Sequence, residues 1–201
     1  AANGETLNVH TDMGLVTQIF RESDFYPLTG EMAIGHTRYS TTGSSELCNA
    51  QPMVVEGLQG RLALANNGNI INSLQLKNQL QDEWNCSFNS TTDSEVLALL
   101  LANASGATWE DRLFYCMRLV EGAFSMVSLT KDTLMAARDP LGIRPMCIGK
   151  LNGGWVIASE SCALDPLGAT YERELDPGEA IVIDKDGFHS ATWTGSQGRR
   201  A

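Results

Sequence analysis

Apolar positions change their spacing twice along the chain. Between residues 71 and 122 they recur every three or four residues, as at Leu76, Leu80 and Trp84, and this period is typical of amphipathic helices. Before and after this stretch they come in short runs that end at Gly, Pro, Asn or Asp residues, which is typical of strands and turns. The sequence therefore predicts helices grouped between two sets of strands.

The same pattern assigns these elements to definite segments. Helices are expected from Ile71, from Ser94 and from a capping box at Thr108, with a further short helix between residues 18 and 28. Strands are expected over residues 6–9, 13–16, 53–55, 62–65, 124–129, 134–137, 146–148, 155–158 and 180–183. Because the turns between these strands are too short to join parallel neighbours, we expect antiparallel sheets in an α+β fold.

Length and composition narrow the class of protein. At 201 residues and 43% hydrophobic, the chain can bury one sizeable core, and we expect one domain over residues 1–194 with a frayed tail over 195–201. No apolar run reaches the roughly 18 residues that a membrane span needs. The net charge of -10 argues against a nucleic-acid partner. The histidines and the five cysteines show no metal-ligand spacing, and free thiols in a reducing cytoplasm fit best.

The most polar loop covers residues 35–43, with the sequence GHTRYSTTG. Arg38 offers a planar fork of N–H donors that can hold a carboxylate at two points, and Thr41 and Thr42 can both donate and accept hydrogen bonds. The simpler interpretation is a solvated loop whose arginine pairs with a nearby acid. The residues of this loop alone leave both interpretations open.

A second cluster, Asn66-Asn67-Gly68-Asn69, directly follows the strand predicted over residues 62–65. Such residues favour positive φ and can leave backbone N–H groups pointing outward, as an oxyanion site requires. A plain tight turn is the commoner explanation of the same residues.

Asp93 comes directly before the helix that is predicted from Ser94. It is either the N-cap of that helix or a carboxylate held there to receive a ligand's ammonium group. If the three clusters meet, Arg38 suits an α-carboxylate, Asp93 suits an α-amine, and Asn67 with Gly68 suits a carbonyl oxygen that becomes negative. Together they would describe an amino acid whose side chain undergoes acyl transfer.

Ordered motifs along nearly the whole chain point to one family. They are Met13-Gly14-Leu15-Val16, residues 35–43, Asn49-Ala50-Gln51-Pro52, Asn67-Gly68-Asn69, Thr92-Asp93-Ser94-Glu95, residues 138–145 (RDPLGIRP) and Ser159-Glu160-Ser161-Cys162. In these motifs the chain resembles the glutaminase domain of the amidophosphoribosyltransferases, a family of class II glutamine amidotransferases.

The resemblance implies an N-terminal-nucleophile hydrolase fold, a four-layer sandwich of two stacked antiparallel sheets flanked by helices. The family frees ammonia from glutamine and passes it to phosphoribosylpyrophosphate on a second domain, in purine biosynthesis. Carried over by motif, Arg38, Thr41, Thr42 and Asp93 bind glutamine, and Asn67 with Gly68 forms the oxyanion hole. The resemblance also implies no cofactor in this part of the protein, magnesium on the transferase domain, and a cytoplasmic homo-oligomer.

Two departures from the family pattern concern catalysis. The family's nucleophile is an N-terminal cysteine, whereas residue 1 is Ala1, whose methyl group cannot attack an amide. The family's opening segment and its phosphoribosyltransferase domain are also missing from this sequence, so both are expected as partners. Cys48 has no flanking histidine to activate it, and Asn66 stands where the family usually has histidine.

We therefore expect an incomplete glutaminase domain that is inert by itself. Either a separate piece of chain completes its sheet, or the chain is less stable than an intact glutaminase domain. A non-catalytic glutamine-binding or regulatory module is an alternative from a different class. A third interpretation is a scaffold in which Arg38 and Asp93 are relics. Calorimetry with glutamine separates the first two interpretations, because a sensor should bind glutamine without help. Under the third interpretation, Arg38→Ala and Asp93→Ala would change no property other than stability.

Overall fold

The computed structural model describes residues 1–38 and 46–195, so the predictions for Thr41 and Thr42 lie outside the described residues. The helices are α1 (Val16–Ile19), α2 (Glu22–Phe25), α3 (Ser73–Trp84), α4 (Asp93–Asn103) and α5 (Trp109–Leu119). The strands are β1 (Met53–Gly57), β2 (Gly60–Ile70), β3 (Gly122–Leu129), β4 (Leu134–Arg138), β5 (Cys147–Leu151), β6 (Gly154–Ala158), β7 (Thr170–Glu174), β8 (Glu179–Asp184) and β9 (Gly187–Thr192). Short 3₁₀ helices are η1 (Leu47–Asn49), η2 (Ser161–Ala163) and η3 (Asp165–Leu167).

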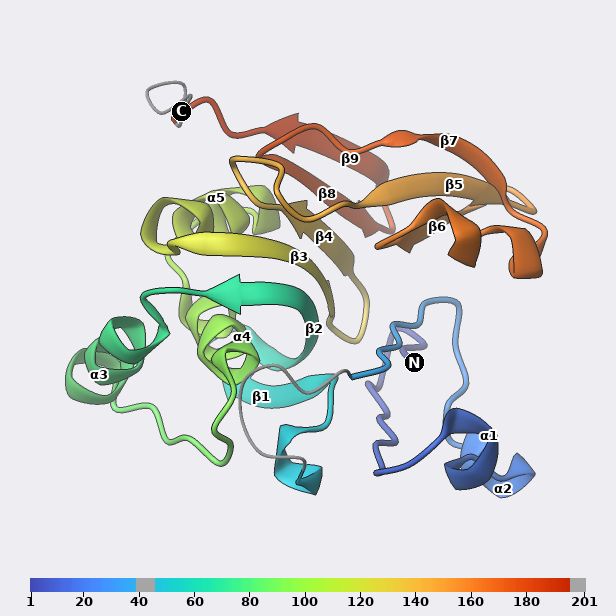
Figure 1. The fold of residues 1–201 in the computed structure, drawn as a ribbon, viewed down its shortest axis with the longest axis horizontal. Helices are drawn as coiled ribbons and strands as arrows, with labels where there is room; N and C mark the ends of the chain where they lie inside the picture. The colour runs from blue at the N-terminus through green and yellow to red at the C-terminus, as the bar shows by residue number, and fades with distance from the viewer. Residues whose placement is uncertain (39–45, 196–201) are drawn as a thin grey trace.

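The strands form two antiparallel sheets (Figure 1). The larger sheet has the order β1-β2-β3-β4-β8-β9, and the smaller one has the order β6-β5-β7. Neighbouring strands in both sheets run antiparallel, as short hairpin connections require. The predicted α+β class, with antiparallel sheets and flanking helices, is confirmed.

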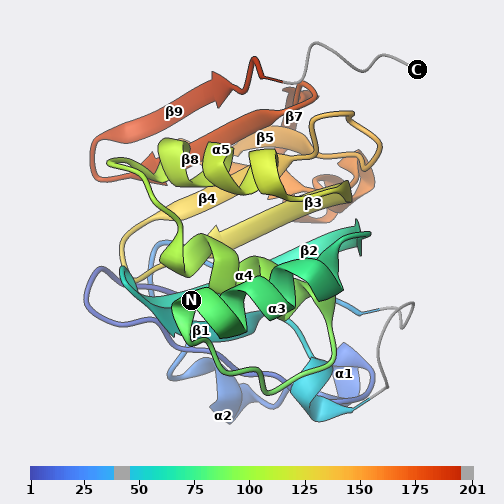
Figure 2. The ribbon, with the colours of Figure 1, turned by 90° about the vertical axis from the view of Figure 1, so that its left-hand side faces the viewer.

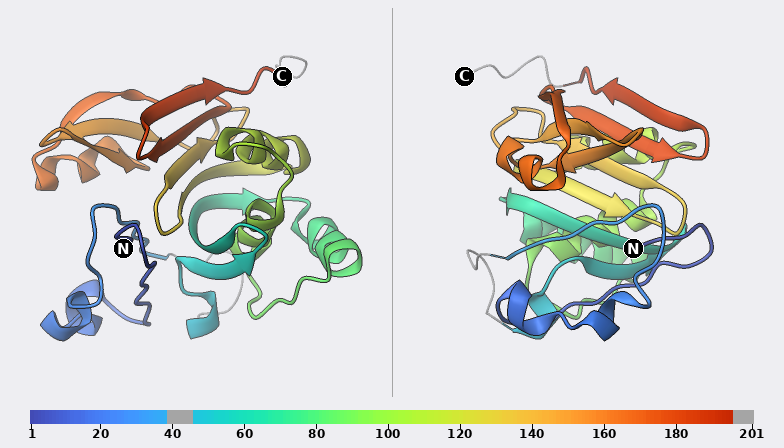
Figure 3. Two further views of the ribbon diagram at one scale, coloured as in Figure 1. Left: turned by 180° about the vertical axis from the view of Figure 1, so that it is seen from behind. Right: turned by 90° about the vertical axis from the view of Figure 1, so that its right-hand side faces the viewer.

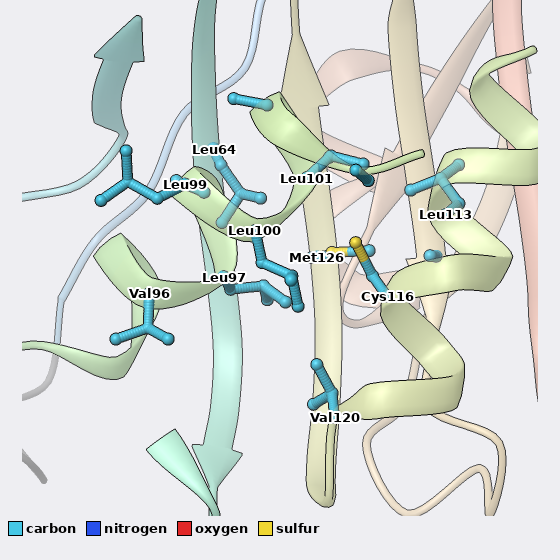
Figure 4. Close-up of a cluster of buried hydrophobic side chains, with 14 of the residues drawn as sticks. Leu64, Val96, Leu97, Leu99, Leu100, Leu101, Leu113, Cys116, Val120 and Met126 are labelled. Atoms are coloured by element: carbon cyan, nitrogen blue, oxygen red, sulfur yellow. The ribbon is translucent and has the colours of Figure 1, made fainter. Parts of the chain in front are cut away.

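Helices α3, α4 and α5 cover one face of the larger sheet (Figure 2). Helix α4 is the central one, and every residue from Asp93 to Ala102 is buried. After the polar first turn, residues 96–102 are apolar on all sides, as expected for a buried helix. Its residues Leu97 and Leu100 lie in one cluster with Leu64 of β2 and Met126 of β3 (Figure 4). Each leucine buried in this way contributes about 1.5–3 kcal/mol, so α4 and β2 are held firmly together.

A second apolar cluster joins the two sheets. Ile148 of β5 packs with Ala136 of β4 and Ile181 of β8, and partly buried Val127 and Ile157 complete the contact. Both views of Figure 3 show the smaller, orange sheet beside the red strands β8 and β9. The smaller sheet is therefore fixed against the face of the larger one that the helices leave open.

The N-terminal segment differs from its prediction. The strand expected over residues 6–9 is wrong, because Leu7 makes only an isolated bridge with Ala2, which also pairs with Met32. The strand expected over residues 13–16 is also wrong, since α1 begins at Val16 and α2 follows at Glu22. Short apolar runs of this length are compatible with either element, and the partner strand decides between them.

Neither the positive φ nor the tight turn expected at residues 66–69 is found. Strand β2 continues through this cluster to Ile70, and Asn66 pairs with Met126 while Gly68 pairs with Phe124. Asparagine and glycine have low strand propensity, but pairing with a buried neighbour overrides it here. The Gly68 position also requires glycine, because a Cβ there would lie 2.0 Å from the carbonyl oxygen of Ala123.

Strands β7 and β9 were not predicted from the sequence. Both lie at the edges of their sheets and are mostly exposed, with charged residues such as Glu172 and Arg173 in β7. Edge strands commonly carry such residues, which hides the alternating apolar pattern.

The longest of the described helices, α3, has 12 residues, whereas a membrane-spanning helix needs about 20. None of the described helices is long and apolar enough to cross a membrane.

Candidate functional site

A cleft of about 1130 Å³ opens where the end of β2, the start of α4, residues 35–38 and the smaller sheet come together. Four of the residues predicted to bind a ligand line it: Arg38, Asn67, Gly68 and Asp93. They come from three separate segments of the sequence, so only the fold brings them together. Their roles toward a ligand remain a prediction.

The end of β2 offers one of its backbone edges to this cleft. Strand β1 pairs with β2 only as far as Leu64, whereas β3 stays paired to Ile70. Beyond Leu64, the Asn66 N–H donates to Gln51 Oε1 at 2.7 Å, and the Ile70 N–H donates to Asp93 Oδ2 at 2.9 Å. Because N–H groups two residues apart point to the same edge of a strand, the Gly68 N–H between them also points there. Gly68 thus presents a backbone donor toward the cleft.

Asp93 is the first residue of α4, and the structure assigns the N-cap to Thr92 instead. The Thr92 hydroxyl oxygen accepts from the Glu95 N–H at 3.4 Å. Asp93 is 9% exposed, and its Oδ2 is used by the Ile70 N–H. The partial positive charge of the helix start stabilises its carboxylate. Among contacts within the described residues, Oδ1 is left available to a ligand in the cleft.

The loop that precedes α4 is held by buried polar contacts. Glu95, 3% exposed, accepts from the N–H groups of Asn89 and Ser90 at 2.8 and 2.7 Å. Asn49 is fully buried and its Oδ1 accepts from the Thr91 N–H at 3.0 Å. These bonds fix the direction in which the chain enters α4, and they therefore fix Asp93.

Residues 138–145 include a second loop held by buried polar contacts, and its residues Ile143 and Arg144 line the cleft. The carboxylate of Asp139 is fully buried and accepts from the N–H groups of Leu141, Ile143 and Arg144 at 3.0, 3.1 and 2.9 Å. Arg138 closes the loop by donating to the carbonyl oxygens of Arg144 and Gly142, each at 2.8 Å. From this loop the Arg144 guanidinium donates to the side-chain oxygen of Asn67.

The electrostatics of the cleft combine the guanidinium groups of Arg38 and Arg144 with the carboxylates of Asp93 and Glu160. Burial lowers the pKa of His36 below its ordinary value of 6.5; the hydrogen bond to the Asn66 backbone opposes this, and the charge of Arg38 lowers the pKa further. His36 is therefore neutral near pH 7. Arg38 and Arg144 supply positive charge to the cleft, and Asp93 supplies negative charge, which suits a zwitterionic ligand.

The cysteines show which thiols could reach a ligand. Cys162 is exposed and lines the cleft, and its Sγ donates to Glu160 Oε2 at 3.8 Å. Cys48 is exposed beside Glu46 and is not among the residues that line the cleft. In the part of the chain that the structure describes, no group of three or more His, Cys, Asp or Glu side chains is arranged to hold a metal ion.

Sequence reasoning did not single out Gln51 or Arg144 as site residues. Both stand inside motifs that carry the family resemblance, but their contacts reach residues 15 and 77 positions away. A local pattern contains no signal of such distant pairing. Their position within these motifs was the only indication in the sequence that they belong to the site.

Comparison with known proteins identifies the class. A family model described as a glutamine amidotransferase domain matches residues 22–191. The chain therefore belongs to the glutamine amidotransferase domain family. Within this class it is similar to an amidophosphoribosyltransferase from Synechocystis sp., with 45% identity over 192 residues that cover 93% of the chain.

Solved structures agree with this assignment. The fold matches the glutamine phosphoribosylpyrophosphate amidotransferase of Bacillus subtilis, complexed with ADP and GMP, with a TM-score of 0.86, 38% identity and 96% of the chain covered. It also matches a structure of the allosteric regulatory enzyme of purine biosynthesis, with a TM-score of 0.85, 38% identity and the same coverage. The N-terminal-nucleophile hydrolase fold is thereby confirmed. The chain spans about two fifths of these proteins, 39% of the Synechocystis relative and 41% of each solved chain.

Proposed function

We propose that this chain is the glutamine-binding part of an amidophosphoribosyltransferase and that it binds L-glutamine in the cleft. Arg38 holds the α-carboxylate through two N–H donors, and Asp93 Oδ1 accepts from the α-ammonium group. The side-chain amide of Asn67 and the N–H of Gly68 donate to the carbonyl oxygen of the glutamine side chain. The observation that carries the proposal is that these four residues line one cleft.

The arrangement suits hydrolysis of a side-chain amide. When a thiolate attacks the glutamine Cδ, the carbonyl oxygen becomes negative, and donors aimed at it lower the barrier by about 2.7–4 kcal/mol for each donor. Collapse of this intermediate breaks the C–N bond and releases ammonia after a proton is delivered to the nitrogen. Water then attacks the thioester and releases glutamate, which restores the thiol.

The nucleophile comes from outside these 201 residues in this proposal. Nucleophilic thiols in proteins lie beside a base or a positive charge, whereas Cys162 donates to the exposed carboxylate of Glu160. The chain by itself is therefore expected to bind glutamine without releasing glutamate.

The cleft also suits an added strand that brings the thiol. Strand β6 lies at one end of the smaller sheet and, among the described residues, pairs only with β5. Its residues Val156, Ile157 and Ala158 line the cleft. An extended segment with a cysteine at its start can pair with this edge and cover these apolar side chains.

The proposal extends to the longer protein of which such a domain is a part. The relatives named above are phosphoribosyltransferases, so ammonia released in the cleft is passed to phosphoribosylpyrophosphate on a further domain. Magnesium belongs to that transferase domain, and this cleft uses no cofactor. Thr41 and Thr42 follow Arg38 in sequence and contribute hydroxyl groups to the same glutamine. A homo-oligomer in the cytoplasm is the expected setting.

Calorimetry with glutamine tests the binding step. We expect Arg38→Met and Asp93→Asn each to weaken glutamine binding by roughly 10- to 100-fold, because each removes a charge-assisted contact of about 1.5–3 kcal/mol. Arg118→Met is the matched control, since Arg118 is exposed on α5 and lies over the ring of Tyr115. Equal affinity of all four proteins for glutamine would overturn the assignment of the cleft.

An assay for glutamate release tests the source of the nucleophile. The chain alone is expected to be inactive, and a synthetic peptide that begins Cys-Gly-Ile is expected to restore glutamate release. The control peptide begins with serine in place of cysteine. Steady release by the chain alone would contradict the external nucleophile.

A non-catalytic glutamine-binding module is the second candidate. It is favoured by the presence of carboxylate-, amine- and carbonyl-binding groups in a cleft whose thiol among the described residues, Cys162, has a carboxylate as its partner. Glutamine binding with no glutamate release, even with the cysteine peptide added, would support this candidate over the first.

A further inference from the structure

The geometry points to Arg144 as a positioning residue that sets the orientation of the Asn67 amide and so makes Asn67 an oxyanion donor. This inference deepens the proposed function and depends on it. It arises from a contact across 77 positions of the sequence, in which an Arg144 terminal nitrogen donates to Asn67 Oδ1.

Hydrogen bonds to both backbone groups of Arg144 fix the position from which its side chain extends. Its N–H donates to the buried carboxylate of Asp139 at 2.9 Å, and its carbonyl oxygen accepts from Arg138 Nε at 2.8 Å. The next residue, Pro145, accepts from the Ser125 hydroxyl at 2.8 Å, and Ser125 lies opposite Asn67 in the β2–β3 pairing. The loop is therefore tied to β3 directly opposite Asn67, in addition to the contact of Arg144 with Asn67 itself.

The chemistry of the two side chains then decides which way the amide points. A carboxamide has an acceptor oxygen on one side and a donor nitrogen on the other, and its orientation follows from its partners. Arginine has donors only, so Asn67 must turn Oδ1 toward Arg144 and Nδ2 away from it. Nδ2 is the group that an oxyanion needs, and the neighbouring Gly68 N–H already points into the cleft.

Arg144 also strengthens the donor that it orients. A hydrogen bond from a cation to the amide oxygen polarises the amide, and this makes its N–H groups better donors. Arg144 is half-buried, and its Nε is buried without a partner among the described residues. Its positive charge therefore acts on the cleft with less screening from water than that of a fully exposed arginine.

The first test observes the orientation directly, without a ligand. In the wild-type chain, the side-chain amide protons of Asn67 are expected to give one sharp pair of NMR signals. Arg144→Met is expected to shift or broaden them, and Arg144→Lys, which keeps a cationic donor, is expected to restore them in part. The control Arg118→Met is expected to leave them unchanged. Identical Asn67 signals in the wild type and in Arg144→Met would overturn the inference.

The second test distinguishes the contribution of the glutamine side-chain amide to affinity from the contributions of the α-carboxylate and the α-amine. L-norvaline keeps the α-carboxylate and α-amine but lacks the side-chain amide. Arg144→Met is expected to weaken glutamine binding by about 5- to 20-fold and norvaline binding by less than about twofold, since one oriented hydrogen bond is lost. Asn67→Asp keeps the contact with Arg144 but removes the donor, so it is expected to cause a similar selective loss.

The outcomes distinguish this inference from the proposed function. An equal loss for both ligands would mean that Arg144 binds the carboxylate or supports the fold, and it would overturn the positioning role. Unchanged affinity for both ligands would overturn it as well. If the wild-type chain binds neither ligand, the proposed function fails, and the NMR comparison still decides whether Arg144 orients Asn67.

Discussion

The two halves of β2 belong to one strand but have different neighbours. Its first half, from Gly60 to Leu64, pairs with β1 on one side, and its residues Leu62 and Leu64 are 1% and 0% exposed. Its second half, from Asn66 to Ile70, has β3 on one side, while Gln51, Asp93 and the cleft take the place of β1 on the other. The first half serves the core, and the second half presents backbone donors.

The difference shows how a sheet can supply a binding site without a loop. A strand that is paired on both sides has used all of its backbone groups, so it offers a ligand side chains only. Where one partner strand stops early, alternate N–H groups become available at that edge. Here side chains cap two of these groups, at Asn66 and Ile70, and leave the Gly68 N–H between them. The site therefore lies where the pairing with β1 ends.

Leu64→Ala gives the largest expected effect, because it removes a fully buried side chain from the first half of β2. We expect the free energy of unfolding to fall by about 2–5 kcal/mol through lost contacts and a cavity beside α4. Urea denaturation measures this change, and Leu58→Ala, at a residue 80% exposed in the turn between β1 and β2, is the control. Glutamine affinity of the folded variant should stay at the wild-type value. A large loss of affinity would mean that the two halves are not separate in function.

Gly68→Ala perturbs the second half and is expected to have the next largest effect. The added Cβ would lie 2.0 Å from the Ala123 carbonyl oxygen, so β2 must move away from β3. We expect a stability loss of about 1–3 kcal/mol together with loss of glutamine binding, because the displaced N–H no longer points into the cleft. Gly154→Ala on β6 is a matched control, since its Cβ would make only an ordinary contact, 3.4 Å from the Leu151 carbonyl oxygen. Wild-type glutamine affinity in Gly68→Ala would contradict the donor role of this N–H.

The pH dependence of stability gives the smallest effect. It distinguishes the second half of β2, where His36 contacts Asn66, from the distant polar cluster around Glu179. Burial lowers the pKa of His36, which bonds to the Asn66 backbone, below 6.5. Burial alone would raise the pKa of Glu179, but hydrogen bonds from Arg173, Ser190 and the Asp176 N–H outweigh it and hold this pKa below 4.5. In both cases the unfolded chain binds the proton more tightly, so stability falls as the pH decreases.

The two groups act in different windows of pH. Loss of stability through His36 begins near pH 6.5, and loss through Glu179 begins near pH 4.5. Urea denaturation between about pH 8 and about pH 3 is expected to show both steps in the wild type. His36→Gln should remove the upper step and Glu179→Gln the lower one. If His36→Gln leaves the upper step in place, another group takes up the proton responsible for it, and the assignment to His36 is wrong.

Much of the fold followed from the spacing of apolar residues. The hairpin of β1 and β2, the helices α3, α4 and α5, and the antiparallel sheets all agree with the sequence pattern. The prediction failed at the N-terminal strands and at residues 66–69, where a local pattern predicted a turn. Both errors have one cause, since pairing with a distant strand decides whether a short or polar segment becomes a strand.

The residue types at the candidate site were also readable from the sequence, as Arg38, Asp93, Asn67 and Gly68 each suggest a partner of known chemistry. The contributions of Gln51 and Arg144 were not readable. Gln51 acts by capping a backbone N–H, and Arg144 acts by turning an amide around. Each effect depends on a direction in space that spacing along the chain does not encode.

The sequence by itself determined the class of this protein through its ordered motifs, and it also determined helices α3, α4 and α5, most of the antiparallel strands and the kinds of groups offered to a ligand, because these depend on neighbouring residues. Only the tertiary structure decided that β2 runs on past its pairing with β1, that site residues from three separate segments meet in one cleft, and that Arg144 faces the oxygen of Asn67. The physical reason is that a hydrogen bond has a direction, and the packing of distant segments sets that direction.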